Sequence, residues 1–154
     1  MEGIKTGFKN FDELTNGLDY RKVYSIFGNK ESGKELFIYK VVQSALASNN
    51  AIVYVLTSKS YSDLINEFNS RGININPYLG ENFKILDDFS RTNSPSATDN
   101  SYAKILNGPL DLTGLSVSLS STNSDFVKDA KPVINSFDNL SNLLIYNNPV
   151  TVYR

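Results

Sequence analysis

The sequence predicts a three-layer α/β domain built around a mostly parallel sheet. Apolar runs of strand length alternate with segments of helical periodicity, as in consecutive βαβ units. One run, Ala51–Leu56, is rich in β-branched residues from end to end, which is typical of a central parallel strand covered on both faces. A glycine-containing loop over residues 28–35 joins a predicted strand to a predicted helix. A chain of 154 residues has the usual length of one domain, predicted here over residues 1–154.

The first third of the chain predicts a short helix, a strand and a longer helix. Apolar residues recur at helical spacing over residues 8–14, and Asn16-Gly17 ends that turn. Residues 22–27 have the pattern of a buried strand. The segment 34–47 is apolar on most sides, as expected for a helix packed against a sheet.

The middle of the chain continues the alternation. Ser62 has the position of an N-cap for a helix that runs through Arg71, with Gly72 as its stop. The run Phe83–Leu86 predicts a third strand. The serine- and asparagine-rich stretch 90–101 predicts a flexible, solvated loop.

The last third is less regular. Residues 111–121 are ambiguous, because Leu115, Val117 and Leu119 alternate like a strand. Residues 131–137 predict a further strand and residues 140–146 a helix. The final segment, Val150–Arg154, looks like the opening of another helix, so we expect the domain to be short of its C-terminal strands.

Composition narrows the class of protein. The net charge is −1, 40% of the residues are apolar, and no apolar run reaches the 18 residues of a membrane span. The N-terminus lacks the basic-then-apolar pattern of a signal peptide, and there is no cysteine, so we expect a cytoplasmic protein with no membrane contact. A net charge near zero does not support binding of nucleic acid by bulk electrostatics, although it does not exclude a local basic patch.

The missing residue types exclude several chemistries. The chain has no histidine and no cysteine, which removes Ser-His-Asp and Cys-His catalysis and nearly every zinc site. Carboxylates, lysines, hydroxyls and backbone groups remain. They suit phosphoryl transfer better than most reactions.

The loop after the first predicted strand matches a phosphate-binding pattern except in its last position. The pattern G-x-x-x-x-G-K-[ST] fits as far as Lys34, and then Glu35 replaces the hydroxyl residue that holds Mg²⁺. In a strand–loop–helix, backbone N–H groups and the helix N-terminus face the phosphates, and the lysine reaches the outer ones. The candidate nucleotide-binding residues are Gly28, Asn29, Lys30, Glu31, Ser32, Gly33, Lys34 and Glu35.

Motifs along nearly the whole chain resemble those of a known family. The opening Ile4-x-Thr6-Gly7-Phe8, the loop 28–35 and the run Val53–Ser58 occur in the order found in archaeal KaiC-like and RadA-like proteins of the RecA superfamily. The segments 111–115 and 133–137 continue that order. This resemblance implies a RecA-like P-loop domain that binds ATP, with or without Mg²⁺, and assembles with copies of itself or with another RecA-family protein.

The resemblance also exposes three departures at the positions that carry the family's chemistry. Glu35 stands at the Mg²⁺-binding hydroxyl, and Asn135 replaces the Walker B aspartate. The catalytic glutamate falls near Ser58-Lys59, where there is no carboxylate. Asp138 lies three residues past Asn135 and is a candidate substitute. Asp87-Asp88 is a second candidate, because it closes an apolar strand as a Walker B aspartate does, but its favoured interpretation is a charged exit from a strand into a loop.

Three functions remain open at this point. The departures favour a pseudo-ATPase with a regulatory or assembly role, weak or no nucleotide binding, no catalytic residues and no metal site. The first alternative is an active ATPase linked to DNA recombination or signalling. The second is a purely structural partner subunit.

Overall fold

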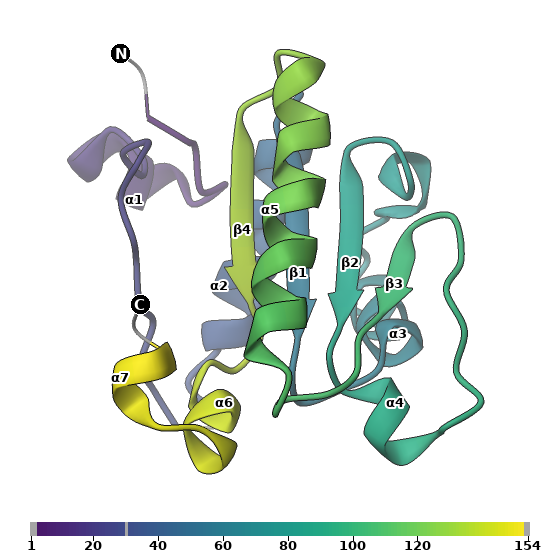
Figure 1. The fold of residues 1–154 in the computed structure, drawn as a ribbon. Helices are drawn as coiled ribbons and strands as arrows, with labels where there is room; N and C mark the ends of the chain where they lie inside the picture. The colour runs from purple at the N-terminus through teal and green to yellow at the C-terminus, as the bar shows by residue number, and fades with distance from the viewer. Residues whose placement is uncertain (1–2, 30, 153–154) are drawn as a thin grey trace. The chain divides into compact units, whose positions relative to one another are not determined.

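The computed structural model describes residues 3–29 and 31–152, and it divides the chain into two compact units, Met1–Asn50 and Ala51–Arg154. The predicted α/β class is confirmed. The second unit holds a four-stranded, all-parallel sheet between helices (Figure 1). Whether residues 1–154 form one domain stays a prediction.

The first unit is built around aromatic contacts between its two helices, α1 (Lys9–Thr15) and α2 (Lys34–Ala47). The ring of Phe37 stacks on Phe8 at 5.2 Å between centroids and meets Phe11 edge-on at 5.7 Å. Such pairs add about 1 kcal/mol to the free energy of burial. Both helices lie within two residues of the bounds expected from the sequence.

The strand expected at residues 22–27 is absent from the structure. The segment is irregular and exposed: the side chains of Val23 and Phe27 are 95% and 91% accessible. A strand needs a neighbour to accept and donate its backbone hydrogen bonds, and no strand in the described part of the chain pairs with this segment. The apolar pattern of residues 22–27 was therefore not enough to predict a strand.

The second unit contains the sheet. Its strand order is β3-β2-β1-β4, and every neighbouring pair is parallel. All six residues of the central strand are buried, as the β-branched run predicts. The strands are β1 (Ala51–Leu56), β2 (Phe83–Asp87), β3 (Ala103–Ile105) and β4 (Val133–Phe137). The three-residue strand β3 was not expected from the sequence.

Helices cover both faces of this sheet and complete the three layers. On one face, Leu115 and Phe126 of α5 (Leu112–Lys128) join a buried cluster with alternate residues of β1, including Val53. On the other face, Phe68 of α3 (Tyr61–Ser70) meets the ring of Tyr54 edge-on at 6.4 Å. Successive side chains of a strand point to opposite faces, so β1 contributes to both layers.

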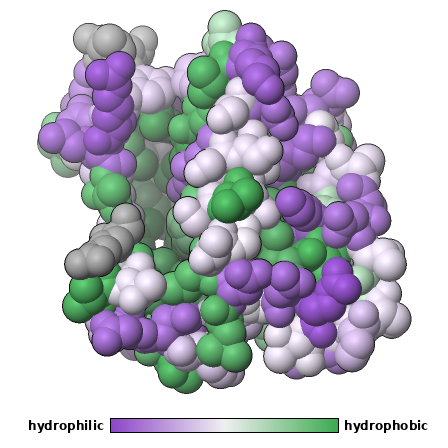
Figure 2. Space-filling view, viewed as in Figure 1, coloured by the Kyte–Doolittle hydropathy of each residue, from purple (hydrophilic) through white to green (hydrophobic). Residues whose placement is uncertain are grey.

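The ambiguous segment 111–121 proves to be the start of the long helix α5. A helical spacing also fits the apolar residues that pack against the core, namely Leu112, Leu115 and Leu119. The side chain of Val117 is 63% exposed on the outer side. The outer surface of α5 is mostly pale or purple around one green patch (Figure 2), in keeping with its many serines. The helical period therefore overrides the short apparent alternation.

The remaining elements are short. The N-cap of α3 is Ser60, which lies two residues before Ser62, the N-cap expected from the sequence. The stretch 90–101, expected as a loop, begins with a helical turn. The short elements are a 3₁₀ turn (Asn76–Tyr78), α4 (Ser90–Asn93), α6 (Ser141–Tyr146) and α7 (Pro149–Val152).

Two further sequence expectations concern the C-terminus and membranes. The helix opening predicted at residues 150–154 is present as α7, while Tyr153 and Arg154 lie outside the described residues. Among the helices that the structure describes, none is long and apolar enough to cross a membrane.

Candidate phosphate-binding loop and the carboxyl edge of the sheet

The two glycines of the 28–35 loop stand where a side chain would be strained or would clash. Gly33, the residue before α2, has φ +81°, a left-handed conformation that glycine adopts without strain. A Cβ on Gly28 would lie only 2.3 Å from the hydroxyl oxygen of Ser32. The loop closes on itself through Ser32, whose hydroxyl donates to the carbonyl of Asn29 at 2.8 Å. Lys30 lies outside the described residues.

Lys34 directs its ammonium group back onto the loop. The Nζ atom donates to the carbonyls of Gly28 and Asn29, each at 3.1 Å, and lies 3.3 Å from Oε1 of Glu35. The side chains of this ion pair are 28% and 35% exposed. Glu31, the other loop carboxylate among the candidates, is exposed. The lysine expected to meet phosphate is thus engaged by its own loop and by the adjacent glutamate.

In the second unit, the residue in the Walker B position is neutral and exposed. Asn135 lies in the middle of β4 with its side chain open to solvent. An amide is a weaker metal ligand than a carboxylate and carries no charge to balance Mg²⁺.

Asp138, the candidate substitute for Asn135, is occupied by bonds within the unit. Its carboxylate accepts from the backbone N–H groups of Thr57 and Ser58 at 2.8 and 2.9 Å, and from their hydroxyls at 3.0 and 2.5 Å. The backbone N–H of Asn139 donates to it as well. Five donors fill the lone pairs of one carboxylate, so Asp138 ties the end of β1 to the end of β4.

No carboxylate stands at Ser58-Lys59. The hydroxyl of Ser58 donates to Asp138, and the Nζ atom of Lys59 lies 2.7 and 2.9 Å from the carboxylate oxygens of Glu67. The hydroxyl and the amine at these positions are both engaged within the unit. Neither of these side chains is a carboxylate, which is the group that orients an attacking water in phosphoryl transfer.

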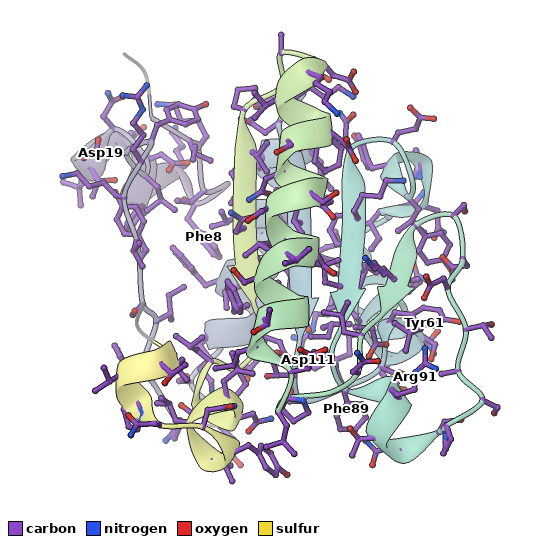
Figure 3. All side chains as sticks on the ribbon, viewed as in Figure 1. Phe8, Asp19, Tyr61, Phe89, Arg91 and Asp111 are labelled. Carbon is purple, nitrogen blue, oxygen red and sulfur yellow. The ribbon has the colours of Figure 1, made fainter. Side chains whose placement is uncertain are left out.

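Asp87 is the last residue of β2 and Asp88 follows it, so the pair stands at the exit from a strand, as interpreted from the sequence. Both residues are buried, at 0% and 1% exposure. Asp87 accepts from the N–H groups of Tyr61, Phe89 and Ser90 at 2.7–3.0 Å and from the Ser90 hydroxyl at 2.7 Å. It therefore joins the starts of α3 and α4 to the end of β2. In Figure 3, Tyr61, Phe89 and Arg91 lie near one another below β2 and β3.

Asp88 has no comparable set of donors. One of its oxygens accepts from the N–H of Gly108 at 3.2 Å, and the other, also buried, has no hydrogen-bond partner in the described part of the chain. Burial is the largest cause that raises the pKa of this carboxyl; the Gly108 bond lowers it, the nearby charges of Asp111 and Asp87 raise it, and together they place it at about 7. Two adjacent acids after an apolar run, at the carboxyl edge of a parallel sheet, were the signal for this group.

Asp111 stands at the N-terminal end of α5, beside the carboxyl ends of the strands (Figure 3). Its carboxylate caps the helix by accepting from the N–H of Gly114 at 2.8 Å and also accepts from the amide of Asn107 at 2.8 Å. The Asn107 bond, followed by the Gly114 bond, lowers the pKa of Asp111. From the sequence, Asp111 belongs to the family-like segment 111–115 and was not predicted to lie at this edge.

The first unit offers features that hold phosphate, and neither unit, taken separately, offers a set of ligands that fits a metal ion among its described residues. The loop offers a glycine-rich turn, a helix N-terminus and Lys34, which are the features that hold phosphate. At the positions that would hold a metal ion, Glu35 is paired with Lys34, Asn135 is a neutral amide, and the carboxylate of Asp138 already accepts from five donors. Within residues 3–29 and 31–152, no group of three histidine, cysteine, aspartate or glutamate side chains could hold a metal ion. The residues present therefore do not fit Mg²⁺.

Comparison with known proteins places the chain in a family. A family model described as "ATPase: KaiC" matches residues 4–153. Comparisons with curated proteins and with solved structures find no match. The matched residues span nearly the whole sequence and include both the 28–35 loop and the sheet. The chain therefore belongs to the KaiC ATPase family, within the RecA-like P-loop superfamily.

Proposed function

We propose that this chain is a pseudo-ATPase of the KaiC family. It binds nucleotide weakly through the 28–35 loop, does not turn it over, and acts through regulation or assembly. The observation that carries the proposal is the absence of a free carboxylate where the chemistry needs one. Asn135 is neutral, Asp138 is bonded by five donors, and Ser58-Lys59 carries no acid.

Phosphoryl transfer depends on a metal ion and on an oriented water. A metal ion bridges the outer phosphates and neutralises the charge that develops as the phosphoryl group leaves, and a carboxylate orients the water. The chain lacks the residues for both tasks, while it keeps the turn and the lysine that hold phosphate. Loss at all three positions removes turnover and leaves binding.

Phosphate release measured over a range of Mg²⁺ concentrations tests the lack of turnover. We expect release at the background rate, with the wild-type chain and Lys34→Ala indistinguishable. A turnover of about 0.01 s⁻¹ or more, modest beside typical enzymes, would favour the active ATPase instead if Lys34→Ala abolished it.

Calorimetry with ATP tests the retained binding. We expect weak binding to the wild-type chain and none to Lys34→Ala, because Lys34 is the only loop lysine that the motif assigns to the outer phosphates. Absence of binding to both proteins would leave the loop as a structural relic and would favour a purely structural partner subunit.

The partner in this proposal is a second copy of the chain or another RecA-family protein. The proposal also includes an archaeal origin, which rests on the resemblance of the motifs, and a cytoplasmic location, which rests on the absence of cysteine. A net charge of −1 gives no support to a nucleic-acid partner.

A further inference from the structure

We propose that Glu35 is a built-in competitor of phosphate: its carboxylate occupies the Lys34 ammonium that a nucleotide must reach. The inference rests on the proposed nucleotide binding and adds how the affinity of that site is set. It is carried by the contacts of Lys34 in the first turn of α2.

The donors of Lys34 are all used. An ammonium group has three N–H donors, and the Nζ atom has three acceptors: the carbonyl oxygens of Gly28 and Asn29 and the carboxylate of Glu35. A phosphate oxygen must displace one of them. The carbonyls are neutral parts of the loop, so the carboxylate is the acceptor whose charge a phosphate would replace.

Glu35 also uses the second feature of the loop that attracts anions. The N-terminus of a helix carries a partial positive charge that stabilises a nearby anion. Glu35 is the acid in the first turn of the 14-residue helix α2. The same carboxylate therefore pairs with the lysine and is stabilised by the charge of the helix end, and it repels any further negative charge brought beside it.

The loop contains its own control for this argument. Glu31 carries the same charge within the same loop, yet its side chain is exposed and no ion pair joins it to Lys34 in the described residues. Neutralising Glu31 removes one charge from the surroundings of the loop. Neutralising Glu35 removes one charge and also frees the lysine.

The experiment compares ATP binding by calorimetry in EDTA, which takes metal out of the measurement. We expect Glu35→Gln to lower the Kd about fivefold, the scale of one unit charge at a few ångströms in a partly exposed site. We expect Glu31→Gln to change it by about twofold or less, because an exposed charge is screened by solvent. Circular dichroism confirms that each variant is folded.

Glu35→Thr provides a second, independent arm. It removes the same charge, so it should bind more tightly than the wild-type chain in EDTA, as Glu35→Gln does. Since Thr also supplies the missing hydroxyl, its Kd should fall further when Mg²⁺ is added, whereas that of Glu35→Gln should not. If Glu35→Thr bound ATP more tightly than the wild-type chain only in the presence of Mg²⁺, competition would be overturned, and the effect of Glu35 would be on metal binding alone.

The outcomes separate this inference from the proposed function. Equal gains for Glu31→Gln and Glu35→Gln, or no gain for Glu35→Gln beside a wild-type chain that binds, would overturn the competition and leave nucleotide binding intact. No binding by any of the four proteins would overturn nucleotide binding itself, and the competition with it.

Discussion

At the scale of single residues, Asp88 is the group whose protonation is most strongly tied to the fold. Its side chain is 1% exposed, one oxygen lacks a hydrogen-bond partner among the described residues, and burial is the largest cause that raises its pKa from 3.8 to about 7. Between those values the folded chain keeps the proton and the unfolded chain has lost it. The free energy of unfolding therefore falls as the pH rises from about 4 to 7 and stays at the lower value above 7.

This gives a prediction for the pH dependence of stability. A shift of three pKa units corresponds to a loss on the order of 4 kcal/mol across the interval. We expect Asp88→Asn to abolish this contribution, because the amide does not ionise, so its urea midpoints should vary less between pH 4.5 and 7.5 than those of the wild-type chain. Asp125→Asn, at an exposed acid of α5, is the matched control and should keep the wild-type slope. An unchanged slope in Asp88→Asn would contradict the assignment.

At the scale of elements, the start of α3 shows how one side chain fixes a helix boundary. The hydroxyl of Ser60 accepts from the N–H of Asp63 at 3.2 Å, and the carboxylate of Asp63 accepts from the N–H of Ser60 at 3.3 Å. These reciprocal bonds form a capping box and satisfy N–H groups that the helix leaves unpaired. Ser62, the N-cap expected from the sequence, lies inside the helix.

The two serines can be compared directly. Ser60→Ala should lower the free energy of unfolding by about 1 kcal/mol, since it removes an N-cap. Ser62→Ala should change it by about 0.5 kcal/mol or less, because the site is exposed and its hydroxyl bonds to the Ser60 hydroxyl at 2.9 Å rather than capping a helix N–H. Chemical denaturation of both variants measures the difference, and a larger loss in Ser62→Ala would return the boundary to the position that the sequence suggested.

The elements that the sequence predicts well are those in which periodicity and burial agree. The helix at Lys34–Ala47 and the strand at Ala51–Leu56 have the same bounds in the structure. The strand at residues 22–27 failed because strand formation depends on a partner that local pattern does not reveal. The three-residue strand β3 carries too few residues for any period to be read.

The candidate site was predictable to a similar extent. The loop motif predicted a glycine turn directly before a helix, and Gly33 and α2 have that local geometry, whereas the phosphate-binding role of Lys34 stays a prediction. The bonds of Asp138 to Thr57 and Ser58 span about 80 residues of sequence, and the buried Asp88 accepts from the N–H of Gly108, 20 residues away. Both are tertiary features, so they could not be predicted from the spacing of residues close in sequence.

At the scale of the whole molecule, the two edges of the sheet differ. The outward N–H groups of Ala103 and Ile105 in β3 are capped at 2.8 Å by the side chains of Asn100 and Asp99. That edge is closed by its own preceding loop. Natural sheets close their edges in such ways because an open edge pairs with other chains.

Within the second unit, the edge formed by β4 has no such cover among the described residues. The bonds from Ala51 N–H to Pro132 O and from Asp138 N–H to Val55 O fix which backbone groups of β4 face β1. By the alternation of a parallel ladder, those of Val133, Asn135 and Phe137 point the other way. β4 is the last strand in the sheet order, so these groups are open to pairing with another chain.

We therefore expect the chain to associate through β4. Sedimentation at several concentrations should detect a dimer or a larger species, and Asn135→Pro should shift it toward monomer. Proline removes only an outward N–H at this position and leaves the ladder to β1 intact, as proline on an edge strand does. Asn135→Ala, which keeps the N–H, is the control and should associate like the wild-type chain. A wild-type monomer at high concentration that binds no hydrophobic dye would mean that the chain closes its own edge, and association would then have to be sought at another surface.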